Sequence, residues 1–456
     1  MTDRWHRLPE HSSGVSATTL TRRQLVVAGA TLSGAMFWRG SSTLARQATP
    51  IASPVDATRD WQSERWVGTW AAGVHRPSPG MGEAFPSQIF DLEGKTVRQI
   101  VRGSIGGDRV RIRLANTFGD APLVVGVAHI ALRDGDERIE PSTDRTLSFS
   151  GSPRVTIPPG SIVLSDPVAL NVPPLAELAV SLYFPEPATS STVHGFAFQT
   201  NYMSDDGDFT AETVLPVETT MQSWLFLTGV DVAGSDAAGA IVALGDSITD
   251  GAFSTPDTNH RWPDFLAERV SMPDRGAFAV LNQGIGGNRL LNDSPSELPF
   301  FGPAALARFD REVLALPGVT HLIIFEGIND IGLSTMSGDP SQDVSTEEMI
   351  AVLRQLAERA HEHGIVAIGA TITPYEGTEN YFSADGEAKR QAVNDWIRSG
   401  GAFDGLIDFD AVVRDPDHPA RLLPAYDGGD HLHINDAGFR AMAESIDLAL
   451  FMKGGA

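Results

Sequence analysis

The chain has 456 residues, 42% of them hydrophobic, which is enough for packed cores, and at this length two domains are expected. Its formal net charge of −24 disfavours nucleic acid and anionic membrane surfaces as partners, because phosphate binding requires clustered lysine and arginine. There is no cysteine, which excludes disulfides, thiolate metal ligands and cysteine nucleophiles.

The first 45 residues have the pattern of an export signal. Arg22 and Arg23 precede a modestly apolar run, residues 25–38, and small residues that suit cleavage follow it. The run is 14 residues long, whereas a membrane-spanning helix needs about 20. A twin-arginine-type signal peptide at 1–45 is therefore favoured over a membrane anchor. We expect export to the periplasm or the medium, and no stable membrane insertion after processing.

An antiparallel β-domain is predicted to follow. Residues 46–58 are rich in proline, alanine and threonine and predict a linker. From 59 to 230 apolar and polar residues alternate, as in Val110, Ile112 and Leu114 with arginines between them. This period of two places one face of each strand in a core, and turn sequences separate the runs. Residues 59–230 are thus expected to form a β-sandwich or jelly-roll accessory domain.

A parallel α/β domain is predicted for residues 239–453, after a small polar linker at 231–238. Here short apolar runs alternate with helical patterns. Strands are expected at 241–244, 279–281, 321–325, 366–370 and 406–409, and helices at 262–270, 304–316, 346–363, 384–398 and 436–448. Such alternation predicts a parallel sheet covered by helices on both faces. Its ligand crevice lies where the strands end at their carboxyl edge.

Ser247 is the first candidate catalytic residue. It lies in Gly-Asp-Ser-Ile-Thr-Asp-Gly (245–251), a tight turn directly after the apolar run 239–244. A serine in this position stands at the edge of the sheet where ligands bind. Glycine, aspartate and serine are ordinary turn residues, so the importance of this motif depends on three others that follow it.

Two of those motifs offer hydrogen-bond donors. Asn-Gln-Gly-Ile-Gly-Gly-Asn (282–288) follows the second strand, and its glycines leave backbone amides uncovered that suit an oxyanion. A dinucleotide-binding loop is the less favoured alternative, because position 289 is arginine where that motif needs glycine. Glu-Gly-Ile-Asn-Asp (326–330) closes the third strand, and the Asn329 carboxamide can donate there. A plain turn is the alternative interpretation of both motifs.

The fourth motif, Asp-Gly-Gly-Asp-His-Leu-His-Ile-Asn (427–435), precedes the last helix. An aspartate three residues before a histidine can accept its Nδ1 proton, so Asp430 and His433 are the preferred pair to activate a serine. His431 is held in reserve, since two histidines that alternate in an extended segment face opposite sides. A divalent metal bound by these aspartates and histidines is the competing interpretation.

In this order, the four motifs resemble the signature blocks of the SGNH (GDSL-type) hydrolases, a family of serine esterases and lipases. The resemblance covers residues 239–453 and implies a three-layer α/β/α, flavodoxin-like fold. It also implies that Ser247 is the nucleophile and that Asp430 and His433 complete a catalytic triad. The upstream β-domain resembles the accessory domain of some secreted members.

The same resemblance implies an oxyanion hole. Its donors are the Ser247 N–H, the Gly287 N–H and the Asn329 side chain, and no cofactor or metal is required. The glycine block reads Gly-Gly-Asn-Arg (286–289), where relatives often have glycine, then aspartate or asparagine, then serine or threonine. The chain lacks the G-x-S-x-G elbow of classical α/β-hydrolases, which disfavours that fold.

The sequence therefore predicts an exported carboxylic-ester hydrolase. Its substrate is expected to be a small-molecule or polysaccharide ester, with a short-chain or carbohydrate-linked acyl group such as acetyl. Two alternatives stay open: a lipase or lysophospholipase with an apolar mouth at loops 291–303 and 333–345, and a non-catalytic carbohydrate-binding protein. His194 and the tryptophans at 66 and 70 are candidates to line a sugar or acyl site, although such residues more often pack in a core. The oligomeric state is not predicted.

Overall fold

The computed structural model describes residues 64–82, 85–271 and 277–452. The predicted signal peptide and the linker at 46–58 lie outside the described residues. Five parallel strands form one sheet in the order β17-β16-β18-β19-β20. They span Gly239–Gly245 (β16), Phe278–Gly284 (β17), Val319–Phe325 (β18), Val366–Ala370 (β19) and Gly405–Ile407 (β20).

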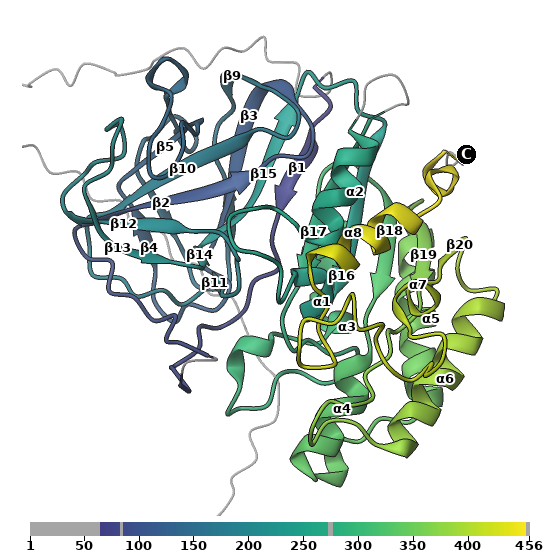
Figure 1. Cartoon of the computed structure of the whole chain (residues 1–456). Coiled ribbons are helices and arrows are strands. Elements are labelled where there is room, and N and C mark those ends of the chain that lie inside the picture. The colour runs from purple at the N-terminus through teal and green to yellow at the C-terminus, as the bar shows by residue number, and fades with distance from the viewer. Residues whose placement is uncertain (1–63, 83–84, 272–276, 453–456) are drawn as a thin grey trace, which may run out of the picture. The chain divides into compact units, whose positions relative to one another are not determined.

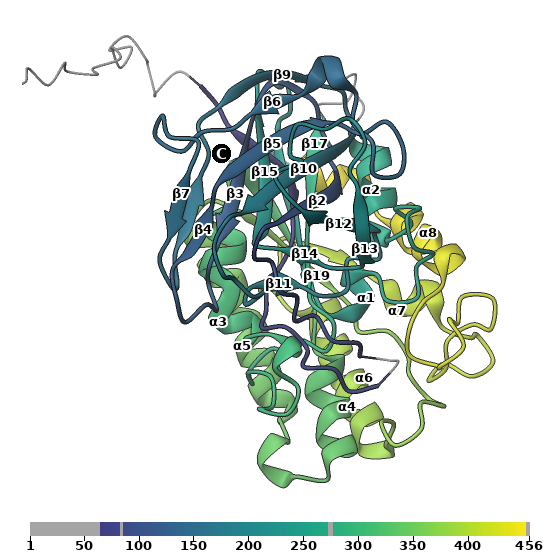
Figure 2. The ribbon, with the colours of Figure 1, turned by 90° about the vertical axis from the view of Figure 1, so that its left-hand side faces the viewer.

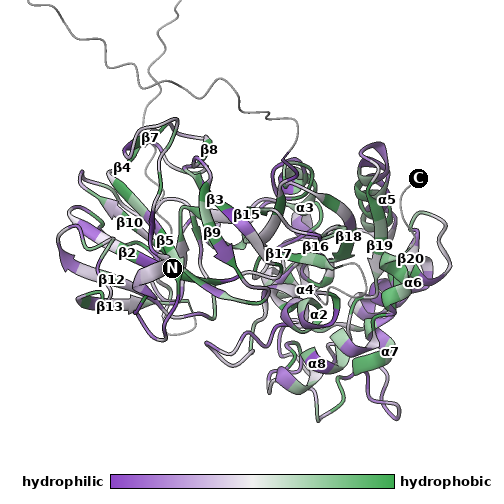
Figure 3. Cartoon of the chain, turned by 90° about the horizontal axis from the view of Figure 1, so that it is seen from above, coloured by the Kyte–Doolittle hydropathy of each residue, from purple (hydrophilic) through white to green (hydrophobic). Residues whose placement is uncertain are grey.

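Helices cover both faces of this sheet. They are α1 (Ser247–Asp250), α2 (Trp262–Val270), α3 (Ala305–Phe309), α4 (Ile328–Ser337), α5 (Thr346–Glu362), α6 (Ala384–Ser399), α7 (Phe409–Val413) and α8 (Asp436–Ser445). In β16, Ile241 packs in one core with side chains of α2 and α8, while Val242 packs in another with side chains of α5. Figure 3 shows apolar strands between these layers, with α3 and α5 on one side and α2 and α8 on the other. The predicted three-layer α/β/α fold is confirmed.

All five strand predictions for the parallel sheet are confirmed, and three details of the surrounding structure differ. The helix predicted at 304–316 is α3 followed by one π-helical turn, Asp310–Leu314. The last strand ends at Ile407 because Phe409 begins α7, and α8 ends at Ser445, where Ile446 turns extended.

Helix α4 was not predicted. Its residues include glycine, serine, threonine and asparagine, which are weak helix formers. Tertiary burial of Ile328, Ile331 and Leu333 outweighs that local preference.

The antiparallel prediction is also confirmed. One sheet has the order β13-β12-β2-β10-β5-β6, and another has β1-β15-β3-β8 with β9 also paired to β3. Their inner faces share one apolar core, in which Val110, Ile112 and Leu114 of β3 are fully buried. Figure 2 shows the strands of both sheets. The first sheet comprises Val217–Met221 (β13), Asn201–Asp206 (β12), Lys95–Arg102 (β2), Glu177–Phe184 (β10), Val127–Leu132 (β5) and Arg145–Thr146 (β6). The second comprises Val67–Ala71 (β1), Leu227–Ala233 (β15), Gly107–Ala115 (β3), Ile162–Leu164 (β8) and Val168–Val172 (β9).

Two short strand pairs complete the antiparallel part. They are β11 (Val193–His194) with β14 (Trp224–Leu225), and β4 (Leu123–Val125) with β7 (Val155–Ile157). The antiparallel and parallel parts belong to one compact unit that runs from Asp60 to Ala456, and strand β1 lies against β17 (Figure 1). The predicted boundary at 231–238 overlaps the end of β15, and β16 begins directly after it. The division into domains at 59–230 and 239–453 stays a prediction. None of the helices in the described ranges is long and apolar enough to cross a membrane.

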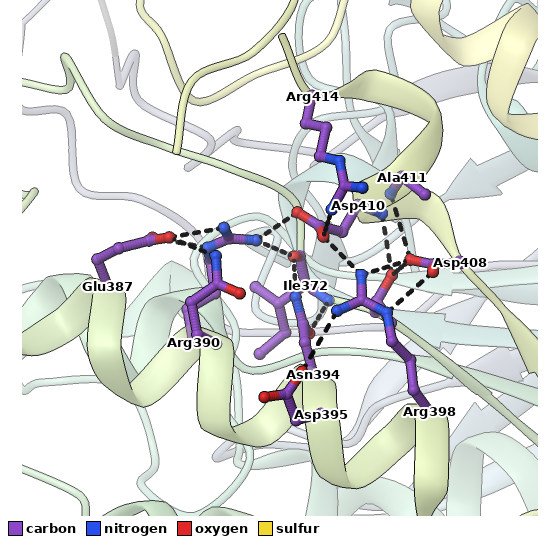
Figure 4. Close-up of polar contacts among 12 residues, drawn as sticks. Ile372, Glu387, Arg390, Asn394, Asp395, Arg398, Asp408, Asp410, Ala411 and Arg414 are labelled. Carbon is purple, nitrogen blue, oxygen red and sulfur yellow. Dashed lines mark hydrogen bonds and ion pairs between the residues drawn. The ribbon is translucent and has the colours of Figure 1, made fainter. Parts of the chain in front are cut away.

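A buried ionic network holds α6 against the parallel sheet beside its last two strands, β19 and β20 (Figure 4). Arg390 donates to Asp410 at 2.7 Å and to the carbonyl of Ile372, which follows β19, at 2.8 Å. Arg398 donates to the same Asp410 carboxylate at 2.6 Å, and the Asn394 side chain accepts the Ile372 N–H at 2.7 Å. These contacts connect one helix to the carboxyl ends of two strands.

Candidate active site

The carboxyl ends of three neighbouring strands meet at one place on the sheet edge. Gly245 of β16 pairs in register with Gly284 of β17 and with Phe325 of β18. Ser247 follows the first strand, the glycine block follows the second, and Asn329 lies in the first turn of α4, after the third. The sheet register therefore gathers segments that are about 40 residues apart in sequence.

The turn that holds Ser247 is fixed by its neighbours. The Asp246 carboxylate accepts the Ile248 N–H at 2.9 Å and so caps the short helix α1. Ser247 is the first helical residue, a position whose N–H has no acceptor within the helix. Gly251 closes the turn with φ 105°, a conformation that a residue with a Cβ adopts at a cost. The Ser247 side chain is thereby presented at the sheet edge.

Ser247, His433 and Asp430 form one hydrogen-bonded chain. His433 Nε2 lies 3.0 Å from Ser247 Oγ, and His433 Nδ1 lies 2.6 Å from Asp430 Oδ2. Because a carboxylate only accepts, Nδ1 carries the proton, and Nε2 of the neutral ring accepts the hydroxyl hydrogen of Ser247. This is the arrangement in which a serine can lose its proton as it attacks.

The Asp430 carboxylate is held ionised. Burial works against the charge, but the hydrogen bond and charge of His433 and the backbone N–H groups of Leu432 and His433 outweigh it. Together they lower the pKa of Asp430 to about 2. An ionised Asp430 keeps His433 in one tautomer and stabilises the imidazolium that forms when His433 takes a proton.

His431 has a different partner. Its Nδ1 lies 2.6 Å from Asp427 Oδ2, and its side chain is 56% exposed. The sequence argument that separated the two histidines assumed an extended segment, and this assumption is wrong. His431 has φ 65°, and the Gly428 N–H donates to the His433 carbonyl at 2.8 Å. A tight turn, rather than strand alternation, sends the two rings to separate aspartates.

The two aspartates and two histidines of the fourth motif thus form two separate Asp–His pairs. In the described part of the chain, no group of three or more histidine, aspartate or glutamate side chains is placed to hold a metal ion.

The glycine block leaves one amide free. Gly284, Ile285, Gly286 and Asn288 all donate their N–H groups, to Asn282 Oδ1, the Gly245 carbonyl, Asp250 Oδ2 and the Ile285 carbonyl respectively. Among the described residues, the Gly287 N–H has no acceptor. Gly287 has φ 76°, and a Cβ there would lie 2.2 Å from the Phe301 ring, so only glycine fits. The Gly287 N–H is the one donor of this loop that a ligand can take.

Asn329 is held beside that loop with its amide oriented. Its Nδ2 donates to the Asn288 carbonyl at 2.8 Å, and its Oδ1 accepts from the Tyr381 hydroxyl at 2.6 Å. The Asn288 carbonyl, which can only accept, therefore fixes which end of the carboxamide is the donor, Tyr381 holds the other end, and the second N–H of Asn329 stays available. Sequence analysis missed Tyr381, which lies in a loop between β19 and α6 and carries no local signal.

Arg308 is a second residue that sequence analysis missed. It is fully buried in α3 and donates to the carbonyls of Gly245 and Gln283 at 2.9 and 2.7 Å and to Asn288 Oδ1 at 2.9 Å. Glu312 pairs with it at 2.6 Å. One guanidinium thus ties the ends of β16 and β17 to the glycine block. Only its fork of donors makes this possible, and the sequence places it as an ordinary helix residue.

Buried carboxyl groups lie under the site. Burial raises the pKa of Asp330 to about 6, although its carboxylate accepts the N–H groups of Leu290 and Leu291. Glu326 is fully buried, and neither of its side-chain oxygens has a hydrogen-bond partner among the described residues. Burial and the nearby Asp246 carboxylate raise the pKa of Glu326 well above its ordinary value. Burial therefore disfavours the ionised form of Glu326, although the Arg308 guanidinium, 3.8 Å from its Oε2, favours it.

An aromatic side chain covers one face of the base. Phe253 stacks on His433 with ring centroids 5.2 Å apart and planes inclined by 10°. It is 49% exposed and has φ 71°, a strained conformation for a residue other than glycine. Strained backbone of this kind is concentrated at functional sites.

The upstream candidates for a sugar site are mostly internal. His194 and Trp70 are buried, and Trp70 packs edge-on against Trp224 with ring centroids 4.9 Å apart. Trp66 lies under the guanidinium of Arg111. These contacts agree with the core-packing alternative.

Comparison with known proteins identifies the parallel part. The model of the GDSL-like lipase/acylhydrolase family matches residues 243–441, a span that contains all four motifs. The resemblance to this family is therefore confirmed for residues 243–441. The protein is accordingly a hydrolase that acts on esters.

Two solved structures illustrate the likeness. An acetylxylan esterase from Geobacillus stearothermophilus is 22% identical, with a TM-score of 0.34 over 46% of this chain and 92% of that one. A GDSL-like lipase from Bacteroides thetaiotaomicron is 20% identical, with a TM-score of 0.35 over 47% of this chain and 89% of that one. A comparison with curated proteins gives no match.

Proposed function

We propose that the protein hydrolyses carboxylic esters through an acyl-enzyme formed on Ser247. The observation that carries the proposal is the unbroken chain of hydrogen bonds from Asp430 through His433 to the Ser247 hydroxyl. A serine hydroxyl alone is a weak nucleophile at neutral pH. An adjacent base whose orientation is fixed by a carboxylate overcomes that weakness.

In the first half-reaction, Ser247 Oγ bonds to the ester carbonyl carbon as its proton passes to His433 Nε2. The carbonyl π electrons move to the oxygen, which becomes an oxyanion. The tetrahedral intermediate collapses when the bond to the alcohol oxygen breaks and His433 gives its proton to that oxygen. The alcohol leaves, and the acyl group stays on Ser247.

Three donors are proposed to stabilise the oxyanion. They are the Ser247 N–H at the first helical position, the unpaired Gly287 N–H and the free N–H of the Asn329 carboxamide. Preorganised donors of this kind lower the barrier because they need no rearrangement as the charge develops. In the second half-reaction, water gives a proton to His433 and attacks the acyl carbon, which releases the acid and returns the proton to Ser247.

The proposed substrates are short-chain or carbohydrate-linked acyl esters, with acetyl esters foremost. Phe301 lies against the glycine block so closely that Gly287 has no room for a Cβ, which favours a small acyl group. The exposed ring of Phe253 beside His433 offers an apolar surface to the alcohol side of the ester. The strongly acidic composition disfavours an anionic lipid surface as substrate.

The test is the variant Ser247→Ala. Turnover of p-nitrophenyl acetate should fall to background, and a fluorophosphonate should label the native protein at Ser247 and leave the variant unlabelled. Ser254→Ala, a change at another buried serine three residues after Gly251, is the matched control and should keep both properties. Retained turnover in Ser247→Ala, or labelling at a different residue, would overturn the proposal.

A panel of substrates tests the acyl specificity. Acetate, butyrate and octanoate esters of p-nitrophenol should be hydrolysed with falling kcat/KM, and acetylated xylan should release acetate. A rise in kcat/KM with chain length would instead favour the lipase alternative. Binding of polysaccharide without turnover of any ester would favour the non-catalytic alternative.

We also propose export by the twin-arginine route, which Arg22 and Arg23 ahead of an apolar run support. A reporter fused after residue 58 should leave the cytoplasm, and replacing both arginines by lysine should retain it there. Export of the double-lysine variant at the native rate would exclude this route.

A further inference from the structure

One buried histidine of the antiparallel part contacts the motif that holds Ser247. His194, in β11, is 3% exposed. Its Nδ1 lies 2.7 Å from the Gly73 carbonyl oxygen, and its Nε2 lies 2.9 Å from Asp250 Oδ1. Asp250 is the last residue of α1, three positions after Ser247. A side chain of the antiparallel part thus reaches the nucleophile turn directly.

The two partners of His194 decide its protonation. A carbonyl oxygen and a carboxylate only accept hydrogen bonds, so both ring nitrogens donate and the ring is an imidazolium paired with an ionised Asp250. Burial opposes the charge, and Arg261 opposes it too. The charge of Asp250 and the two hydrogen bonds outweigh them and raise the pKa of His194.

The neighbouring His75 is neutral, so it does not compete with His194 for the Asp250 carboxylate. Its Nε2 accepts the Gly195 N–H at 2.9 Å, and its Nδ1 donates to the Arg76 carbonyl at 2.7 Å. Burial and the charge of His194 lower the pKa of His75 to about 4, although Asp250 and Glu312 act in the opposite direction. His194 is therefore the one cation of the two.

Asp250 connects His194 to the glycine block, because its carboxylate bonds to both. Its Oδ2 accepts the Gly286 N–H at 2.9 Å, and the next residue is Gly287, whose N–H is free. Phe196, two residues after His194, also lies against this loop: a Cβ on Gly286 would be 3.2 Å from its ring. Phe196 itself packs against Phe300. The antiparallel part holds the loop by a hydrogen-bonded chain and by an aromatic wall.

We propose that His194 is a positioning residue for the oxyanion hole: as an imidazolium it fixes Asp250, which holds the Gly286 N–H and so directs the Gly287 N–H at the substrate. The inference rests on the proposed serine mechanism. It assigns to the antiparallel part a role in catalysis besides packing. Donors to an oxyanion must be held within a fraction of an ångström, and a misplacement of about 1 Å can cost roughly 10²-fold in rate.

The kinetic test is His194→Ala in the full chain. An oxyanion donor acts in the transition state, so kcat should fall about 10- to 100-fold while KM changes less than about 2-fold. Phenylboronic acid, which forms a tetrahedral adduct with an active serine, should bind more weakly by the same factor as kcat falls. Active-site titration corrects each rate for the folded fraction.

The matched control is His129→Ala. His129 is also buried in the antiparallel part and pairs through Nδ1 with Asp144 at 2.9 Å, but it lies in β5 and contacts neither Asp250 nor the glycine block. Its loss should lower thermal stability and leave kcat per titrated site unchanged. Equal kcat in the two alanine variants would show that His194 is only structural and would overturn the proposal.

A conservative variant separates charge from geometry. In Asp250→Asn, the amide oxygen can accept the Gly286 N–H while its Nδ2 donates to a neutral His194, so the chain persists without charge. Asp250→Asn should recover most of the kcat that Asp250→Ala loses. If both variants lose the same amount, the hydrogen-bonded chain is not what positions the loop.

Hydrogen exchange tests the coupling without using activity. In a Ser247→Ala background, adding His194→Ala should speed amide exchange in the peptide that covers 283–291, and adding His129→Ala should not. Faster exchange supports the coupling even if Ser247 proves not to be the nucleophile. Unchanged exchange overturns the coupling even if Ser247 is confirmed as the nucleophile.

Discussion

Two polar networks lie at the carboxyl edge of the same parallel sheet, and they differ in how completely they are paired. At the ends of β19 and β20, the Arg390 and Arg398 guanidinium groups, the Asp410 carboxylate and the Asn394 amide satisfy one another and the Ile372 backbone (Figure 4). At the ends of β16, β17 and β18, neither the Gly287 N–H nor the buried Glu326 carboxyl has a hydrogen-bond partner among the described residues, and Glu326 has only the Arg308 guanidinium 3.8 Å away.

This difference separates a structural network from a candidate functional one. Buried polar groups are normally paired, because an unpaired donor or acceptor in the interior costs stability. A closed network holds helix α6 on the sheet and has nothing left to offer a ligand. The open network leaves the Gly287 N–H, one Asn329 N–H and the base His433 available to a substrate, and ester hydrolysis requires groups of these kinds. Each prediction below changes one network and measures whether activity or stability responds.

The largest expected effect is in the open network, at His433. His433→Ala removes the base that bonds to Ser247, and kcat for p-nitrophenyl acetate should fall roughly 10⁴- to 10⁶-fold. His431→Ala, which removes the histidine paired with Asp427, should lower kcat less than about 3-fold. Steady-state kinetics with active-site titration measures both variants. If His431→Ala is the inactive one, the assignment of the base is wrong.

The next effect is expected at Asn329. Asn329→Ala deletes one oxyanion donor, and kcat should fall about 10²- to 10³-fold with little change in KM. Tyr381→Phe removes the hydroxyl that orients this amide and should cost less than Asn329→Ala, because the amide can still turn its donor to the substrate. A larger loss in Tyr381→Phe than in Asn329→Ala would contradict this order.

The closed network should respond in stability instead. Asp410→Ala removes the buried carboxylate that Arg390 and Arg398 share and leaves them only the more exposed Glu387, Asp395 and Asp408, so the free energy of unfolding in urea should fall by about 3 kcal/mol. Arg414→Ala breaks the more exposed pair with Asp410, 3.3 Å apart, and should cost less than about 1 kcal/mol. Both variants should keep native kcat per folded molecule. Loss of kcat with native stability in Asp410→Ala would contradict the distinction between the networks.

The last prediction concerns the pH dependence of stability, at Glu326. Its raised pKa means that the folded state keeps a proton which the unfolded chain releases above about pH 4.3. The native protein therefore loses stability as pH rises from there, by up to roughly tenfold in the folding constant per pH unit. Glu326→Gln should remove this loss.

Urea unfolding at several pH values measures the effect. The two proteins should be equally stable near pH 4, and the variant should be increasingly the more stable one toward pH 8. A variant that is less stable than the native protein at pH 8 would mean that Glu326 is ionised and paired in the fold.

Much of the fold follows from patterns in the sequence. The apolar runs of β16 to β19 are long enough and bounded clearly enough to predict buried parallel strands, and the period of two in β3 predicts a half-buried antiparallel one. Local propensity did not predict two helical segments correctly. Helix α4 forms from weak helix formers, and the helix after residue 304 changes to a π-helical turn.

For the candidate site, the sequence predicted the pairing of Asp430 with His433, because three residues suffice for the carboxylate to reach Nδ1. It also singled out Ser247, Gly287 and Asn329, whose catalytic roles stay predictions. Spacing along the chain carries this information because each motif ends a strand of one sheet.

The groups that hold those residues were decided by tertiary structure alone. Arg308 donates to three segments, Tyr381 orients Asn329, and His194 reaches Asp250 from the antiparallel part. The sequence indicates the partner of none of the three, since a hydrogen bond depends on where two atoms lie to within a few tenths of an ångström. Sequence periodicity determines which face of an element is buried, and only the packed chain determines which polar groups meet there and which one is left free.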